Sequence, residues 1–150
     1  MYHSPVSLSE FNVELLSKYL FLIPVVVALL CEMTKLTIEA RKSGDVPFEH
    51  FLTAGGFPST HSAFVMSLVI VVGKMMGLDS VEFAITIVFA AIVWYDAMSS
   101  RREIGLQAEV LNRLQRRKRF QTRLGHSLKE VLGGILFGAV VTMAGIWVSV

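Results

Sequence analysis

Four apolar segments, separated by polar stretches of very different length, constrain this chain more than any other feature. They cover about residues 19–38, 62–77, 81–97 and 131–150. Hydrophobic residues make up 53% of the chain and the mean hydropathy is +0.59, which is too apolar for a water-soluble domain of 150 residues. The sequence therefore predicts an all-α integral membrane bundle of about four transmembrane helices, forming a single domain over residues 1–150.

Two pairs of glycines lie four residues apart within these segments. Gly73 pairs with Gly77, and Gly134 pairs with Gly138. Small residues at this spacing let two helix backbones approach closely in a membrane. We therefore expect a compact bundle whose loops cover about residues 39–60, 78–80 and 98–130.

The basic residues are distributed unequally between the two faces of such a bundle. The opposite face has only Lys18 and Lys74, whereas the first loop contributes Arg41 and Lys42. The third loop and its flanks carry Arg101, Arg102, Arg113, Arg116, Arg117, Lys118, Arg119, Arg123 and Lys129. By the positive-inside rule this sequence predicts a multi-pass membrane protein whose two long loops are cytoplasmic and whose termini are outside. A bacterial inner membrane is the expected location.

The basic run over residues 113–123 is predicted to form an interfacial helix against anionic headgroups. Its candidate apolar contacts are Leu111, Leu114, Phe120 and Leu124. The expected partners are therefore membrane lipids, and no nucleic acid is expected.

Ionisable residues from four separate segments are predicted to reach the cytoplasmic face together. These residues are Lys35, His61, Asp96, Arg101, Arg102, His126 and Glu130. Placing charges near a bilayer is costly, so such a cluster indicates a functional site. The two other histidines, His3 and His50, are expected to be solvated loop residues.

The residue types in this cluster suit phosphoryl transfer. A phosphate ester needs cations and N–H donors around its oxygens, an in-line nucleophile, and an acid for the leaving group. Pro58 followed by Ser59 and Thr60 is typical of a helix start, whose free N–H groups bind anions. His126 and His61 are candidates for the nucleophile and the acid.

Several of these segments resemble the type-2 phosphatidic acid phosphatase superfamily, which also contains the vanadium haloperoxidases. The run from Pro58 to His61 is similar to its Pro-Ser-Gly-His motif, and His126-x-x-x-Glu130 is similar to its His-x-x-x-Asp motif. The likeness is to a small divergent bacterial and plastid branch. It is carried by residues 55–63, 95–97, 101–102, 107–112 and 125–126.

The resemblance implies a lipid phosphate phosphatase that acts through a phosphohistidine and needs no metal or cofactor. It implies that His126 is the nucleophile, His61 the general acid and Glu130 the orienting carboxylate. It further implies that phosphate is held by Lys35, Ser59, Thr60, Arg101 and Arg102. Possible supporting residues are Asp96, Arg41, Gln107 and Asn112. The family's six-helix core is reduced to four segments, so a homodimer is a candidate assembly for completing the site.

Simpler interpretations stay open for each part of the cluster. Ser127-x-x-Glu130 is a capping box, which explains both residues without chemistry. Lys35 lies on one helix face with Glu32 and is a candidate for an ion pair. Asp96 either pairs with Arg101 or Arg102, or binds a divalent cation together with Glu103 or Glu109. The alternative function is a non-catalytic membrane protein that binds or moves anionic phospholipids.

Overall fold

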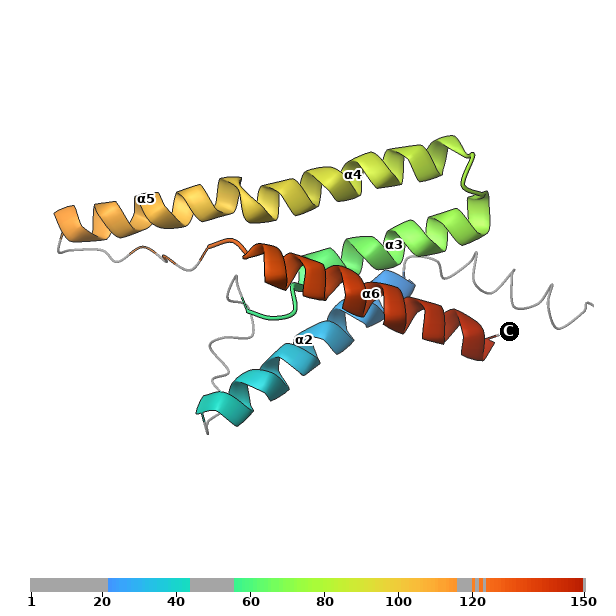
Figure 1. The fold of residues 1–150 in the computed structure, drawn as a ribbon, viewed down its shortest axis with the longest axis horizontal. Helices are drawn as coiled ribbons and strands as arrows, with labels where there is room; N and C mark the ends of the chain where they lie inside the picture. The colour runs from blue at the N-terminus through green and yellow to red at the C-terminus, as the bar shows by residue number, and fades with distance from the viewer. Residues whose placement is uncertain (1–21, 44–55, 116–119, 121, 123, 150) are drawn as a thin grey trace, which may run out of the picture.

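The structure, a computed structural model, describes residues 22–43, 56–115, 120, 122 and 124–149. In this part of the chain every regular element is a helix, which confirms the all-α prediction for the described residues. The helices are α2 (Leu22–Ser43), α3 (Thr60–Met76), α4 (Val81–Met98), α5 (Ser100–Leu114) and α6 (Leu128–Ser149). The end of α2, the start of α3, the end of α4 and the start of α6 lie toward one end of the bundle (Figure 1).

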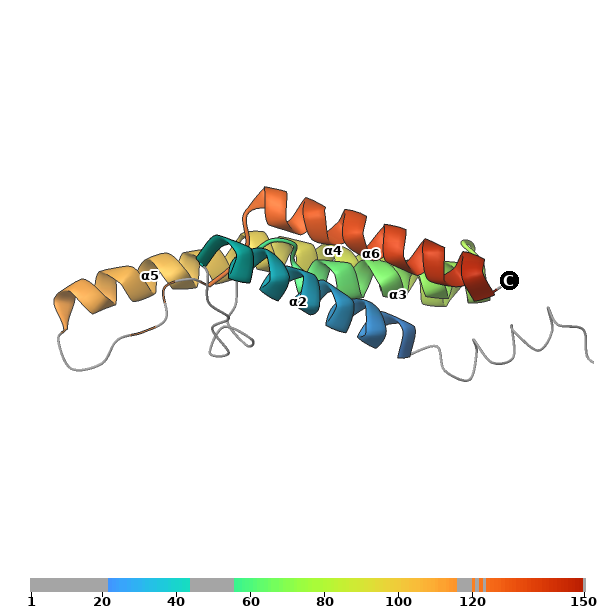
Figure 2. The same ribbon diagram turned by 90° about the horizontal axis from the view of Figure 1, so that it is seen from below.

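Helix α3 is the centre of the bundle. It contacts α2, α4 and α6, and α2 and α6 also contact each other; Figure 2 shows α2, α3 and α6 converging at the middle of the bundle. One buried cluster joins α2 to α3 and consists of Val27, Cys31 and Ala63, with Phe137 and Val141 of α6 packed against it. A second cluster joins α3 to α4 through Val65, Val69 and Ala90. The positions of α2, α4 and α6 are therefore set by their contacts with α3, whereas α5 packs on α4.

Glycines allow α6 to lie directly on the backbone of α3. A Cβ atom on Gly134 would overlap the Ser59 carbonyl, and one on Gly138 would overlap the Ala63 carbonyl. Deeper in the same contact, the Thr142 hydroxyl donates a hydrogen bond of 2.8 Å to the Ser67 hydroxyl, and both side chains are buried. The spacing of small residues in this segment thus serves the close packing that the sequence predicts.

Polar caps and one glycine fix where α3 and α4 end. The Ser59 hydroxyl accepts a hydrogen bond of 3.4 Å from the Ser62 N–H, and the Ser80 hydroxyl accepts one of 3.1 Å from the Phe83 N–H. Gly77 ends α3 with a φ of 90°, a conformation that favours glycine. The expected Gly73–Gly77 pair is therefore split between two roles, because only Gly73 packs against α4, beside the Phe83 ring.

The outer surface of the bundle is apolar. In α4 only Thr86, Ala90 and Ala97 are buried, although the helix is hydrophobic on all sides. A helix of that kind suits a lipid environment. Among the described residues, Val81–Leu114 and Leu128–Trp147 are long and apolar enough to cross a membrane, each with a mean hydropathy of 1.7. Because α3 has 17 residues and α2 carries several charges, the count of four spans stays a prediction.

The expected loop over residues 98–130 was wrong in its first half, because that half is helix α5. Ser99 separates α5 from α4 by a single residue, and the two helices run nearly in line (Figure 1). Good helix formers fill this segment, and Glu109 forms an ion pair of 2.6 Å with Arg113 one turn later. The predicted interfacial helix over 113–123 is not seen as such, since α5 ends at Leu114. Residues 116–119, 121 and 123 lie outside the described part of the chain.

We expect the α3–α6 contact to tolerate no added methyl group. Gly138→Ala should lower the free energy of unfolding by about 1–3 kcal/mol, because the new Cβ meets α3 backbone and the helices must separate. Gly145→Ala is the matched control, since a Cβ there meets nothing within 4 Å and alanine favours the helix. Thermal unfolding in detergent measures both. Equal stability of the two variants would contradict the proposed packing.

Candidate active site

Polar side chains from all parts of the bundle gather where α3 and α6 begin. The α3 start is tied to α6 by the Ser59 N–H, which donates a hydrogen bond of 3.0 Å to the Glu130 carbonyl. The start of α6 is tied in turn to α4 by the His126 N–H, which donates one of 2.9 Å to the Ala97 carbonyl. These backbone bonds place residues far apart in sequence at one end of the bundle.

His126 is held by the glycine that precedes it. Gly125 has a φ of 93°, and a Cβ at this position would overlap the backbone of Arg102. The chain therefore passes closely over the first turn of α5 before it enters α6. Only 9% of His126 is exposed, so its ring lies within the bundle end rather than in solvent.

Glu130 contacts both His126 and the helix cap. Its Oε2 atom accepts a hydrogen bond of 2.7 Å from the Ser127 N–H, and the Ser127 hydroxyl accepts one of 3.3 Å from the Glu130 N–H. The same Oε2 lies 3.5 Å from His126 Nδ1, which is ion-pair distance but too long for a strong hydrogen bond. The capping box is therefore formed, and the carboxylate still faces the imidazole.

The surroundings of His126 disfavour its charged form. Burial lowers the pKa of His126 below its ordinary value of 6.5. The Glu130 carboxylate opposes this change, whereas positive charge on His61 and Lys35 lowers the pKa of His126 further. The two histidines are therefore within electrostatic reach of each other, although they are 65 positions apart in the sequence.

His61 lies in the first turn of α3 and its side chain is accessible to solvent. The charges of Arg101, Lys35 and Glu32 all act on it. His61 is thus within electrostatic reach of His126, Lys35 and Arg101, each from a different part of the chain. An exposed imidazole at this place has access to solvent protons, which a general acid requires.

Lys35 and Thr60 meet on the carboxylate of Glu32. Lys35 Nζ lies 2.6 Å from Glu32 Oε1, and the Thr60 hydroxyl donates a hydrogen bond of 2.6 Å to Glu32 Oε2. Gly56, with a φ of 96°, covers the stem of Lys35, because a Cβ there would lie 3.0 Å from Lys35 Cδ. The Lys35–Glu32 ion pair that the sequence left as an alternative is present.

The remaining predicted phosphate ligands differ in accessibility. Ser59 is fully buried and its hydroxyl caps α3, so it lies beneath the site. Arg101 and Arg102 are exposed at the start of α5. Arg101 Nε donates a hydrogen bond of 2.9 Å to Asp96 Oδ2, which is the ion pair left open for Asp96. The Asp96 carboxylate therefore neutralises part of the positive charge that Arg101 carries.

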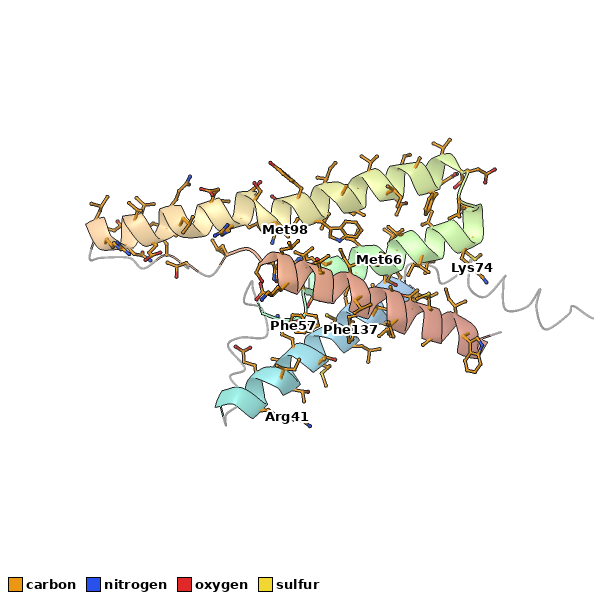
Figure 3. All side chains as sticks on the ribbon, in the orientation of Figure 1. Arg41, Phe57, Met66, Lys74, Met98 and Phe137 are labelled. Atoms are coloured by element: carbon orange, nitrogen blue, oxygen red, sulfur yellow. The ribbon has the colours of Figure 1, made fainter. Side chains whose placement is uncertain are left out.

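The other supporting residues lie away from this cluster. Arg41 is exposed at the end of α2 and points away from the bundle (Figure 3). Gln107 lies on the outer side of α5, where it lines a shallow apolar hollow with Leu106, Val110 and Leu111. Asn112 exchanges two hydrogen bonds, of 2.8 and 2.7 Å, with the backbone of Phe120. Asn112 therefore holds the backbone at Phe120 against the end of α5.

Two contacts at the site have no signal in the sequence. The bond from Thr60 to Glu32 joins positions 28 residues apart, and the bond from His126 to Ala97 joins positions 29 apart. Within the described ranges, no group of three His, Cys, Asp or Glu side chains is arranged to hold a metal ion. Gly55, Lys18, His3, His50 and the basic residues at 116–119 and 123 are outside those ranges, as is the side chain of Lys42.

Comparisons with known proteins identify a matching family and a similar membrane protein. A family model described as the divergent PAP2 family matches residues 16–141. The chain is 31% identical to the "uncharacterized membrane protein YuiD" of Bacillus subtilis (strain 168), in an alignment that covers 87% of this chain and 95% of the relative. No solved structure gives a significant match.

The buried imidazole of His126 should make stability depend on pH. Its pKa is lower in the folded chain than the value near 6.5 of the unfolded chain, so the unfolded chain binds a proton first. The free energy of unfolding should therefore fall as the pH drops below about 6.5 and through the folded pKa. His126→Gln should remove this component, which denaturation at a series of pH values measures.

An NMR titration of histidine-labelled protein, with His126→Gln for assignment, gives the pKa of His126 directly. Glu130→Gln should lower the pKa of His126 further, because it removes the carboxylate that opposes the effect of burial. A His126 pKa at or above 6.5 in the wild type would contradict the geometry described here.

Proposed function

The chain belongs to the divergent PAP2 family, and we propose that it is a membrane phosphatase acting on the phosphate or diphosphate headgroup of a lipid. The observation that carries the proposal is the placement of His126, His61 and Lys35 within electrostatic reach of one another at one end of an apolar bundle. A dianionic phosphate is attracted by the Lys35 ammonium and by the N–H groups at the start of α3. The lipid tails would stay in the bilayer, with the headgroup reaching the site laterally.

His126 Nε2 is the proposed nucleophile. Nδ1 is buried against Glu130, so Nε2 is the ring nitrogen left to face a substrate. Glu130 would orient the ring and stabilise its charged form, as a positioning residue. In the first step the Nε2–P bond forms and the P–O bond to the lipid breaks, while His61 gives its proton to the leaving oxygen. In the second step water attacks phosphorus, the N–P bond breaks, and His61 takes the proton from water.

The phosphate would be held by Lys35, Thr60 and Arg101, with Arg102 and the Ser59 region at its edge. Lys35 is 7% exposed, so its charge acts in an environment with little water. We further propose that this end of the bundle faces the cytoplasm of a bacterial inner membrane. Arg41 lies toward it and Lys74 lies at the other end (Figure 3). Helix α5, which carries Arg101, Arg102 and Arg113, extends from the same end as Arg41 (Figure 1). A homodimer would complete a site built from few helices.

One observation favours the alternative function, a non-catalytic protein that binds or moves anionic phospholipids. Glu130 is closer to the Ser127 N–H than to the His126 ring, at 2.7 Å against 3.5 Å. A carboxylate engaged mainly in capping would hold the imidazole less firmly. Both functions use the same cluster of cationic and polar side chains, and they differ in whether phosphate is released.

The enzymatic proposal predicts that His126→Ala and His61→Ala each lower phosphate release by at least about a hundredfold. The assay follows release from phosphatidic acid, phosphatidylglycerol phosphate and polyprenyl diphosphate by detergent-purified protein. His50→Ala is the matched control and should keep wild-type activity. Release that neither site variant reduces would eliminate the catalytic assignment.

A covalent route makes a second prediction. Vanadate should inhibit the wild type, because it adopts the five-coordinate geometry of the transition state. Labelled substrate should leave an acid-labile phosphoryl adduct on His126 that is missing from His126→Ala. If the enzyme turns over and is inhibited by vanadate, but rapid quenching reveals no phosphoryl adduct on His126, the result would argue for direct attack by water.

A further inference from the structure

Glu32 occupies the centre of the proposed phosphate cradle. Its two carboxylate oxygens bridge Lys35 Nζ and the Thr60 hydroxyl, each at 2.6 Å. The Lys35 and Glu32 side chains are only 8% and 13% exposed. A carboxylate that joins a cation to a hydroxyl presents the same two acceptor atoms that two phosphate oxygens would present.

We propose that Glu32 is an internal competitor for phosphate and sets the charge that a ligand must carry to enter the site. This inference rests on the proposed function, because it takes Lys35 and Thr60 as phosphate ligands. In the ligand-free protein Glu32 forms the ion pair with Lys35 and accepts the hydrogen bond of the Thr60 hydroxyl. An incoming phosphate has to displace the carboxylate, since two anions cannot share one cation and one hydroxyl at these distances.

The competition separates phosphomonoesters from phosphodiesters. A phosphodiester carries one negative charge, as Glu32 does, and gains little by replacing it on Lys35. A phosphomonoester near neutral pH carries up to two charges and offers three free oxygens, which also reach the N–H groups of α3 and the histidines. Most membrane phospholipids are phosphodiesters, so Glu32 would keep the bulk lipid out of the site.

Sequence position gives the proposal a geometric basis. Glu32 and Lys35 are three residues apart on α2, so their side chains lie on one helix face, and Thr60 approaches from α3. The backbone at Gly56 lies close against the Lys35 stem, since a Cβ there would lie 3.0 Å from Lys35 Cδ. We therefore take Glu32, rather than Lys35, as the side chain that turns away when phosphate enters.

The test measures binding of inorganic phosphate and of dimethyl phosphate, a soluble phosphodiester, to detergent-purified protein by calorimetry. Wild type should prefer phosphate at least about tenfold. Glu32→Gln keeps the shape of the side chain but removes its charge, so its affinity for phosphate should rise about tenfold and it should now bind dimethyl phosphate. Glu82→Gln, the same change on an exposed residue at the far end of the bundle, should leave both affinities unchanged.

Further variants separate the possible outcomes. Adding Lys35→Ala to Glu32→Gln should abolish the gain, and Glu32→Ala repeats the test if the glutamine variant does not fold. Unchanged or weaker phosphate binding by a folded Glu32 variant would overturn the inference, as would equal wild-type binding of the two anions. A gain in affinity without any lipid phosphate release would instead sink the proposed enzyme and leave the anion site standing. Release that depends on His126, without that gain, would sink the inference alone.

Discussion

The close approach of α6 to α3 governs the arrangement of the whole bundle end. Because Gly134 and Gly138 present no side chain, the two backbones lie in direct contact, and the Ser59 N–H reaches the Glu130 carbonyl at 3.0 Å. The first turn of α3 and the first turn of α6 are thereby fixed against each other. Both predicted histidines belong to segments that start at this contact, so their relative position depends on packing and not on a flexible loop.

Charge at this end is arranged in opposed pairs. Lys35 faces Glu32, Arg101 faces Asp96, and His126 faces Glu130. For the buried Lys35, pairing with Glu32 offsets the cost of keeping its charge in an apolar setting. An incoming dianion would change each of these balances at once, because the pairs are within reach of one another electrostatically. The cluster is therefore suited to a highly charged group and poorly suited to a neutral one.

Much of this arrangement could be predicted from the sequence, and the failures have physical reasons. Hydropathy located the third segment at 81–97, and α4 runs from Val81 to Met98, because lipid-facing helices are apolar on every side. Helix α5 was missed because its many charged residues suggest a loop. The helix propensity of those residues and the ion pair between Glu109 and Arg113 favour a helix instead. The bond from Thr60 to Glu32 was beyond reach, since it depends on how α2 packs on α3 and leaves no periodic pattern in the chain.

The nearly continuous α4–α5 helix has a mechanical consequence. Its 34 residues measure about 51 Å, well beyond the roughly 30 Å of a bilayer core, so one end must leave the hydrocarbon or the helix must tilt steeply. The returning chain is fastened to α5 at Asn112 and beside Gly105, and then leads to Gly125 and His126. A tilt of α5 about Ser99 would therefore move the Arg102 backbone over which the chain passes at Gly125, directly before His126.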